Sequence, residues 1–305
     1  MQETLSNDQI NARLMRRATY GAVGVALTLV SLKAFALALT GSVAMLGNLF
    51  DSLLDGSASL VNLFAVRHAL TPADQEHRFG HGKAEALAGL AQSVFIFGSA
   101  SYILFEAVNR YFDPQPVENS MIGIGVTLVA IVATLGLITY QRYVVRQTKS
   151  LAIAADSVHY RGDLLMNLSV IAALILSGAM GLYWADPLFG AIIAALIAYS
   201  AWQIFTAAYD QLMDHELSDE ERAQIKDIAL KHLEAMDIHD LRTRKSGIYV
   251  FIQFHLELQP DISLLKAHTI SDEVESAIIK AFPGAEVLIH QDPVGLEELK
   301  GLDYV

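Results

Sequence analysis

Six apolar stretches, each long enough to cross a lipid bilayer as a helix, most constrain what this 305-residue chain can fold into. A spanning helix needs about 20 predominantly apolar residues, because its backbone must satisfy its own hydrogen bonds within the hydrocarbon. Charged residues make up only 18% of the chain, against roughly 25% in ordinary soluble domains. We therefore expect transmembrane helices near 18–39, 44–67, 85–111, 119–141, 151–180 and 187–210.

Composition removes several other classes of protein. The chain contains no cysteine, which excludes a disulfide scaffold and a Cys-ligated zinc or iron–sulfur site. Its 53% hydrophobic content excludes a disordered chain. The first apolar stretch is too long for the core of a signal peptide and lacks a convincing cleavage site, so we interpret it as a membrane span.

Basic side chains in the loops predict the orientation of the spans. Nine of them lie at the amino-terminal flank and in the connections after the second and fourth spans: Arg13, Arg16, Arg17, Arg67, Arg78, Lys83, Arg142, Arg146 and Lys149. The opposite loops offer only Arg110, beside Asp113, Glu118 and Asp186. Because positive loops stay in the cytoplasm, both termini are expected there.

The net charge of −12 is concentrated in the last third of the chain. Residues 1–213 have a net charge of −2, whereas residues 214–305 have a net charge of −10. We therefore expect a membrane domain over 1–212 and a small cytoplasmic domain over 213–305. The sequence of the second domain predicts the element order αββαβ, with helices at 219–234 and 263–281 and strands at 238–244, 248–258 and 285–291. Ser218 and Glu221 fit a capping box that begins the first of these helices.

Two pairs of ionisable residues lie inside apolar spans. Asp51 and Asp55 lie in the second span, and His159 and Asp163 lie in the fifth. Both pairs have i,i+4 spacing, which places the two side chains on one helix face. If the two faces meet, three carboxylates and one imidazole form a complete tetrahedral ligand set for Zn²⁺ or a similar ion. The alternative is a polar vestibule or a set of hydrogen bonds between helices.

The charge of this set suggests exchange of metal for protons. Three carboxylates carry a charge of −3, which a divalent ion reduces to −1. Without metal, a poorly hydrated cluster of this kind should take up protons. Histidine is the side chain best suited to titrate near neutral pH, so metal and protons compete for the same atoms. Lys33, also within a span, either extends toward the interface or pairs with a nearby acid.

Two further groups contain metal-ligand residue types. Asp74, His77 and His81 lie in the connection TPADQEHRFGHGKAE after the second span. In the cytoplasmic domain, five residues lie on or beside adjacent elements, and they could form a mono- or dinuclear metal site: His239, His255, His268, His290 and Asp292. For both groups the alternative is ordinary surface histidines.

Six stretches carry a resemblance to a known family: GSVAMLGNLFDSLLDGSASLVNL, HRFGHGKAEALAGLAQS, ADSVHYRGDLLMN, DLRTRKSG, FIQFHLE and LIHQDP. In combination they resemble the cation diffusion facilitator (CDF) family, and within it the bacterial ferrous-iron/zinc efflux pumps. The resemblance runs from about residue 13 to 293. It implies a homodimer in the bacterial cytoplasmic (inner) membrane, with six spanning helices and a cytoplasmic domain of metallochaperone-like fold.

The resemblance also implies roles for individual residues. It assigns Asp51, Asp55, His159 and Asp163 to the transport site and Asp74, His77 and His81 to a looser loop site. It assigns His239, His255, His268, His290 and Asp292 to a dinuclear cytoplasmic site whose metal stabilises the dimer and influences transport. It matches Lys83 and Asp214 to a charged pair that interlocks the membrane halves. A transport site that includes histidine resembles Zn²⁺/Cd²⁺ transporters, in agreement with the preference of imidazole for zinc over manganese.

We therefore expect an antiporter that exports Zn²⁺ in exchange for protons, with Cd²⁺ and Fe²⁺ as further candidate substrates, and no nucleic-acid partner. One alternative is a membrane-anchored zinc sensor whose cytoplasmic domain dimerises on metal binding. No kinase, cyclase or DNA-binding pattern follows that domain, which counts against the sensor. A second alternative is an intramembrane metalloenzyme, but the chain has no HExxH motif and the inferred site uses four protein ligands. We expect no enzymatic activity.

Overall fold

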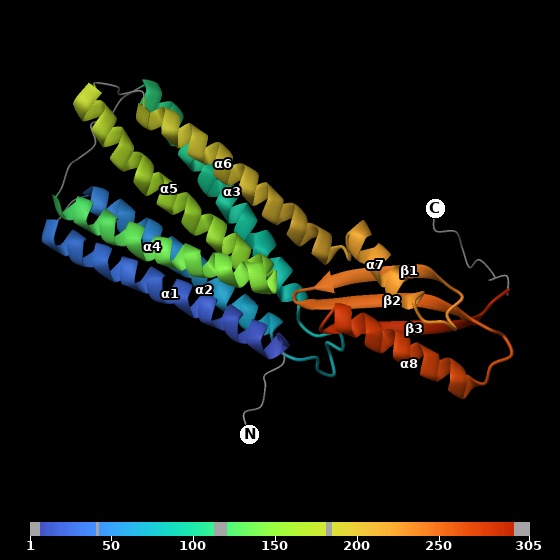
Figure 1. Cartoon of the computed structure of the whole chain (residues 1–305). Coiled ribbons are helices and arrows are strands. Elements are labelled where there is room, and N and C mark those ends of the chain that lie inside the picture. Colours follow the sequence, from blue (N-terminus) through green and yellow to red (C-terminus); the bar gives the residue numbers. More distant parts are fainter. Residues whose placement is uncertain (1–6, 41–42, 113–120, 181–184, 296–305) are drawn as a thin grey trace. The chain divides into compact units, whose positions relative to one another are not determined.

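The computed structural model describes residues 7–40, 43–112, 121–180 and 185–295. The loop acids Asp113 and Glu118, used to predict orientation, lie outside these ranges. The chain divides into two compact units, Met1–Leu212 and Met213–Val305 (Figure 1). The regular secondary structure in the described part of the first unit is helical, and the second unit contains a three-stranded sheet. The predicted fold class, a helical membrane domain followed by a small α+β domain, is confirmed.

Six long helices form the first unit: α1 (Asn7–Thr40), α2 (Val43–Ala69), α3 (Lys83–Phe112), α4 (Met121–Thr148), α5 (Leu151–Met180) and α6 (Ala185–Leu212). Among the described residues, five of them are long and apolar enough to cross a membrane, namely α1, α2, α3, α4 and α6. The sixth expected span corresponds to α5, a helix of 30 residues. Several helices extend past the predicted spans, because a helical backbone can continue into polar flanks after the apolar segment ends.

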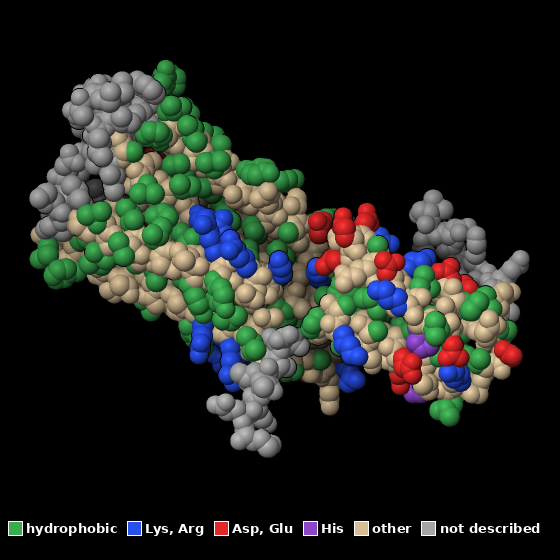
Figure 2. All heavy atoms as spheres, viewed as in Figure 1, with side chains coloured by type: hydrophobic (Ala, Val, Ile, Leu, Met, Phe, Trp, Pro, Cys, Tyr) green, Lys and Arg blue, Asp and Glu red, His purple; other side chains and the backbone are tan. Residues whose placement is uncertain are grey.

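Helix α5 packs against several other helices of the bundle. Helix α3 packs along α6, α1 packs against α2 and α4, and α5 contacts α3, α4 and α6. Large apolar side chains remain exposed around the unit, among them Leu27, Phe35, Phe64, Phe105, Val132 and Trp202. Figure 2 shows many hydrophobic side chains over the helical unit, whereas acidic side chains gather on the other unit. Such an exposed apolar surface is typical of contact with lipid.

Close approach of α5 to α6 depends on a glycine. A Cβ atom added at Gly162 would lie 2.8 Å from Cδ1 of Ile197. Small residues at such positions allow membrane helices to approach closely. Because Gly162 directly precedes Asp163, this contact also fixes where that carboxylate lies relative to α6.

Replacing Gly162 should therefore destabilise the helical unit. We expect Gly162→Val to lower its stability by about 1–3 kcal/mol, because the added methyl groups must displace Ile197. Gly136→Val on α4 is the matched control, since a Cβ atom there meets nothing within 4 Å. Thermal unfolding of the purified protein in detergent measures the difference, and equal midpoints for the two variants would contradict the packing argument.

The second unit has the expected element order. Helix α7 (Asp219–Ala229) is followed by β1 (Asp237–Ser246), β2 (Tyr249–Leu258), α8 (Leu264–Ala281) and β3 (Ala285–Pro293). Ser218 and Glu221 form the predicted capping box at the start of α7. Helix α7 is shorter than predicted because Lys231 and His232 donate backbone hydrogen bonds three residues back, which tightens the chain into turns before β1.

The sheet has the strand order β1-β2-β3. Strand β1 pairs antiparallel with β2, and β2 pairs parallel with β3 through the α8 crossover. One face of β2 contributes Ile252, Phe254 and Leu256 to a core shared with α7 and α8. Since side chains alternate along a strand, the residues between these positions, including His255, lie on the opposite face.

Candidate functional site

Three groups of ligand-type side chains come together in the described part of the chain. They are Asp55, His159 and Asp163 in the helical unit, Asp74, His77 and His81 in the α2–α3 connection, and His239, His255 and Asp292 on the sheet. Within each group, one potential ligand atom from each residue lies within 4.8 Å of the others. All nine residues belong to the groups expected from sequence.

The helical cluster joins α2 to α5. His159 Nε2 lies 2.9 Å from Asp55 Oδ1 and 3.7 Å from Asp163 Oδ2. Four ligands arranged tetrahedrally at about 2.0 Å from Zn²⁺ are separated from one another by about 3.3 Å. The two measured separations lie on either side of that value. The His159 side chain is 6% exposed, whereas those of Asp55 and Asp163 are 24% and 36% exposed, and all three line a cavity.

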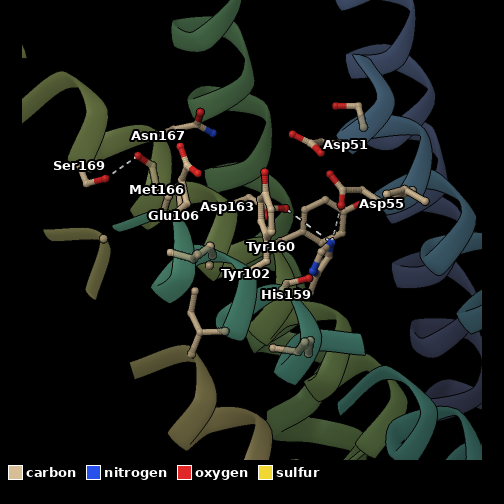
Figure 3. Close-up of a pocket in the computed structure, with 18 of the residues that line it drawn as sticks. Asp51, Asp55, Tyr102, Glu106, His159, Tyr160, Asp163, Met166, Asn167 and Ser169 are labelled. Carbon is tan, nitrogen blue, oxygen red and sulfur yellow. Dashed lines mark hydrogen bonds and ion pairs between the residues drawn. The ribbon is translucent and has the colours of Figure 1, made fainter. Parts of the chain in front are cut away.

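Asp51, the fourth expected ligand, lines the same cavity but does not belong to the tight group. It lies one turn from Asp55 on α2 (Figure 3). Lys33 of α1 also lines this cavity and donates a hydrogen bond from Nζ to Ser52 Oγ at 2.6 Å. Of the two options for Lys33, the structure therefore favours an inward position beside the acidic residues over extension to the interface.

The cavity has a volume of about 830 Å³ and extends away from the cluster in one direction. Its lining includes Phe95, whose ring centroid lies 5.8 Å from that of His159, and also Glu106 and Arg110 further along α3. The 15 residues from Phe95 to Arg110 correspond to about 22 Å of helix. The cavity thus connects the level of His159 with the end of α3 that carries Arg110.

A buried polar layer lies on the other side of the cluster. Asp156, one turn before His159, is 1% exposed and accepts hydrogen bonds from Gln92 at 3.4 Å and Gln141 at 2.6 Å. Tyr160 Oη lies 2.9 Å from Ser59 Oγ, which connects α5 to α2. These contacts join α2, α3, α4 and α5, so packed side chains separate the cluster from the far end of the bundle.

Sequence reasoning missed Asp156, although a signal for it exists. Asp156, His159 and Asp163 have i, i+3, i+7 spacing and therefore share one helix face. Extending the search one turn before the His159–Asp163 pair would have found this carboxylate. Its amide partners on α3 and α4 have no local sequence signal, because they are 64 and 15 residues away.

The loop cluster is held by backbone hydrogen bonds. Asp74 Oδ1 accepts from the backbone N–H groups of Glu76 at 2.9 Å and His77 at 2.6 Å. The hydrogen bond from His77 has the larger effect, and together the two bonds lower the pKa of Asp74. Its carboxylate therefore remains an anion at more acidic pH than usual. Asp74 Oδ2 lies 3.4 Å from His81 Nε2, and Oδ1 lies 3.4 Å from His77 Nδ1.

The cluster on the sheet is assembled by the register of the three strands. His239 pairs with His255 across β1 and β2, and His255 pairs with His290 across β2 and β3. The three imidazoles therefore lie in one row across the sheet, with His255 in the middle. Asp292 Oδ2 lies 2.6 Å from His255 Nδ1 and 3.5 Å from His239 Nε2, while Oδ1 lies 3.3 Å from His290 Nε2.

Two acidic residues that were not expected also contact this row. Glu257 Oε1 lies 3.2 Å from His239 Nδ1, and Glu257 pairs in register with Asp292. Asp240 has a left-handed backbone conformation (φ 48°) at the register shift between His239 and Arg242, and its Oδ2 lies 3.9 Å from His255 Nε2. Glu257 was detectable, since it follows His255 by two residues and shares its face; the bulge at Asp240 was not.

The remaining expected residues lie apart from these clusters. His268 is exposed on α8, where its Nε2 lies 3.4 Å from Asp272 Oδ2, and it is not part of the group on the sheet. Lys83 donates from Nζ to the backbone carbonyl of Leu212 at 3.3 Å. Asp214, which also has a positive φ of 54°, forms an ion pair with Arg244 at 3.3 Å. The interlocking role of Lys83 and Asp214 remains a prediction.

The central position of His255 leads to a test of the cluster on the sheet. We expect His255→Ala to lower Zn²⁺ affinity of this unit at least tenfold, because His255 contacts both Asp292 and the neighbouring imidazoles. His232→Ala is the matched control, since His232 pairs with Glu273 instead. Zinc titration of the full-length variants by calorimetry measures the change. Equal loss of affinity in both variants would argue against a site centred on His255.

Comparisons with known proteins are consistent with this architecture. Residues 20–213 match the family model described as the cation efflux transmembrane domain, and residues 217–294 match the cation efflux protein, cytoplasmic domain. The cation-efflux pump FieF of Yersinia pestis (strain Pestoides F) is 49% identical over 282 residues, which cover 92% of this chain and 94% of the relative. FieF of Yersinia pseudotuberculosis serotype I (strain IP32953) matches with the same values. The match to the solved structure of the putative zinc transporter CzrB in its Zn form has 36% sequence identity and a TM-score of 0.27. It covers 28% of this chain and 98% of the CzrB chain.

Proposed function

This chain belongs to the cation efflux family, also called the cation diffusion facilitators, and we propose that it exports Zn²⁺ from the cytoplasm in exchange for protons. It is a multi-pass membrane protein and a cation efflux transporter. Our proposal adds the metal, the counter-ion and the orientation, with both termini in the cytoplasm of a bacterium and transport across its inner membrane. Cd²⁺ and Fe²⁺ are further candidate substrates of the same site.

The observation that carries the proposal is the contact of His159 with two carboxylates at membrane depth. An isolated charge there is costly, and such residues usually mark ion pathways. One imidazole and the carboxylates of Asp55 and Asp163 supply three ligands, and Asp51 on the same cavity supplies the fourth. A mixed nitrogen and oxygen set suits Zn²⁺, whereas Mn²⁺ is better served by oxygen ligands alone.

Exchange follows from the chemistry of one nitrogen atom. The lone pair of His159 Nε2 binds either a proton or a metal ion, since both use the same electron pair. With a proton, Nε2–H donates to Asp55 over the observed 2.9 Å. When Zn²⁺ enters, the proton must leave, and when protons arrive from outside, the metal is released. Competition at His159 thereby couples the two fluxes.

The cavity and the buried layer support alternating access. With the proposed orientation, the cavity that leads to Arg110 faces the outside, and the layer containing Gln92, Gln141 and Asp156 lies on the cytoplasmic side. The described arrangement then corresponds to an outward-facing state. Transport requires a second state, in which this layer opens and the α3 end of the cavity closes.

We further propose a homodimer, in which the cytoplasmic unit binds metal and strengthens the association of two chains. The row of imidazoles with Asp292 on the helix-free face of the sheet supports metal binding there. The exposed His268 and the residues Lys83 and Asp214 are proposed contributors to the metal site and the dimer contact, respectively.

Removing one carboxylate from the transport site tests the proposal directly. We expect Asp55→Asn to abolish Zn²⁺/H⁺ exchange, because the change removes a ligand and a negative charge without altering side-chain size. The matched control is Asp210→Asn, the same chemical change at an exposed position on α6 outside the cavity. Metal-dependent proton flux in proteoliposomes, measured across a panel of divalent ions, reports the result.

Two outcomes of this flux measurement would overturn parts of the proposal. Unchanged flux in Asp55→Asn would remove Asp55 from the pathway. Parent protein that binds Zn²⁺ in vesicles but moves none would favour the alternative of a membrane-anchored zinc sensor.

Metal selectivity gives a second test. We expect His159→Asp to raise transport of Mn²⁺ relative to Zn²⁺, because an all-carboxylate site lacks the nitrogen ligand that favours zinc. The measurement is competitive uptake of the two ions into the same vesicles. A variant that retains the zinc preference of the parent protein would show that selectivity arises outside the ligand set.

A further inference from the structure

His81 of the loop cluster lies between two other imidazole rings. Its ring centroid lies 4.5 Å from that of His77, which belongs to the cluster, and 4.6 Å from that of His68, which does not. His68 lies in the last turn of α2, the helix that carries Asp55. No role was expected for His68 from the sequence, and its proximity to His81 becomes visible only in the structure.

Backbone contacts orient the side chains around His81. His81 Nδ1 lies 3.3 Å from the carbonyl oxygen of Thr71, a geometry that favours a proton on Nδ1 and leaves the lone pair on Nε2. Nε2 is also the atom that faces Asp74 Oδ2 at 3.4 Å. This separation is close to the roughly 3.3 Å expected between two ligands of one tetrahedral zinc ion. His81 and Asp74 are therefore arranged as two ligands of a common metal.

The cluster as defined by Asp74, His77 and His81 supplies three protein ligands. Closed zinc sites with four protein ligands are the rule where the metal has a structural role. The chain turns immediately after His68, where the backbone N–H of Thr71 donates to the His68 carbonyl at 2.9 Å. That turn brings both the Thr71 carbonyl and the His68 ring to His81, and coordination by His68 requires its side chain to rotate so that a ring nitrogen faces the point between His81 and Asp74.

We propose that His68 is the fourth ligand of the loop site, which then holds Zn²⁺ through three imidazoles and one carboxylate. The inference rests on the proposed binding of metal by Asp74, His77 and His81. With this ligand set, imidazoles predominate in the loop site, whereas carboxylates outnumber the single imidazole in the transport site. The nitrogen-rich loop set favours Zn²⁺ over Mn²⁺ more strongly than the transport set does.

Coordination by His68 also connects the loop site mechanically to helix α2. Asp74, His77 and His81 belong to the α2–α3 connection, whereas His68 belongs to α2 itself. Coordination by His68 fastens the end of α2 to the loop, 13 residues or about 20 Å of helix from Asp55. Metal in the loop thereby restrains the helix that supplies the transport site.

The competing explanation is that His68 only covers the ring of His81. A pair of substitutions separates the two explanations. His68→Phe keeps an aromatic ring against His81 but has no ligand atom, and His68→Gln removes the ring. The full-length protein carries Asp55→Asn and His255→Ala in every sample, so that the helical and cytoplasmic clusters contribute little to Zn²⁺ binding. Calorimetric titration with Zn²⁺ then reports on the loop.

We expect both His68 variants to lower Zn²⁺ affinity of the loop at least tenfold and by similar factors. A His68→Phe variant that keeps the affinity of its background would overturn the proposal. Asp74→Ala in the same background identifies the source of such a failure. If Asp74→Ala abolishes Zn²⁺ binding while His68→Phe does not, only the ligand role of His68 is contradicted. If Asp74→Ala also has no effect, the proposed loop site itself is contradicted.

A spectroscopic variant tests coordination itself. Because the chain has no cysteine, His68→Cys introduces its only thiol. With Co²⁺ as the probe, ligation by that thiolate produces a sulfur-to-metal charge-transfer band in the near ultraviolet. We expect the band in His68→Cys and its loss when Asp74→Ala is added. A band that survives Asp74→Ala would place the thiolate on a different metal and overturn the shared site.

Discussion

The cost of holding carboxylates at membrane depth organises the helical unit. A carboxylate there needs a cation, a proton or several hydrogen bonds, because lipid supplies none of them. Asp55 and Asp163 meet this requirement through His159, and Asp156 meets it through two amide side chains. These contacts connect four helices, so the polar side chains of the proposed transport site also contribute to how the bundle is assembled.

The same requirement explains why one side of the cluster is open and the other is packed. In the proposed mechanism a cation reaches His159 through space that admits water, and the cavity along α3 provides such space. On the opposite side, Asp156 accepts a hydrogen bond from Gln141 and Tyr160 contacts Ser59, so fixed protein partners take the place of water for these two side chains. The proposed change between two access states therefore requires an exchange of hydrogen-bond partners in that layer as well as a tilt of helices.

Local patterns were sufficient to predict the elements and many of the residues brought together here. Apolar length predicted the spans, and i,i+4 spacing placed His159 and Asp163 on one face. Contacts between distant segments were beyond a single sequence, since nothing local indicates that Gln141 faces Asp156 or that His68 touches His81. Strand alternation identified the face of His255, but only the register aligns it with His239 and His290. Alternation alone also places Glu257 on that face, whereas the bulge that brings Asp240 to His255 has no sequence pattern that predicts it.

The parallel pairing of β2 with β3 has a consequence for how the cluster on the sheet can change during evolution. Its three imidazoles come from three strands, and their alignment depends on hydrogen-bond register rather than on the lengths of the segments between them. Insertions in the connection before α8 or after it leave the row intact, whereas a slip of one residue in β3 turns His290 and Asp292 to the opposite face together. Changes in loop length therefore leave the cluster unaffected, whereas a shift in register removes two residues from it at once.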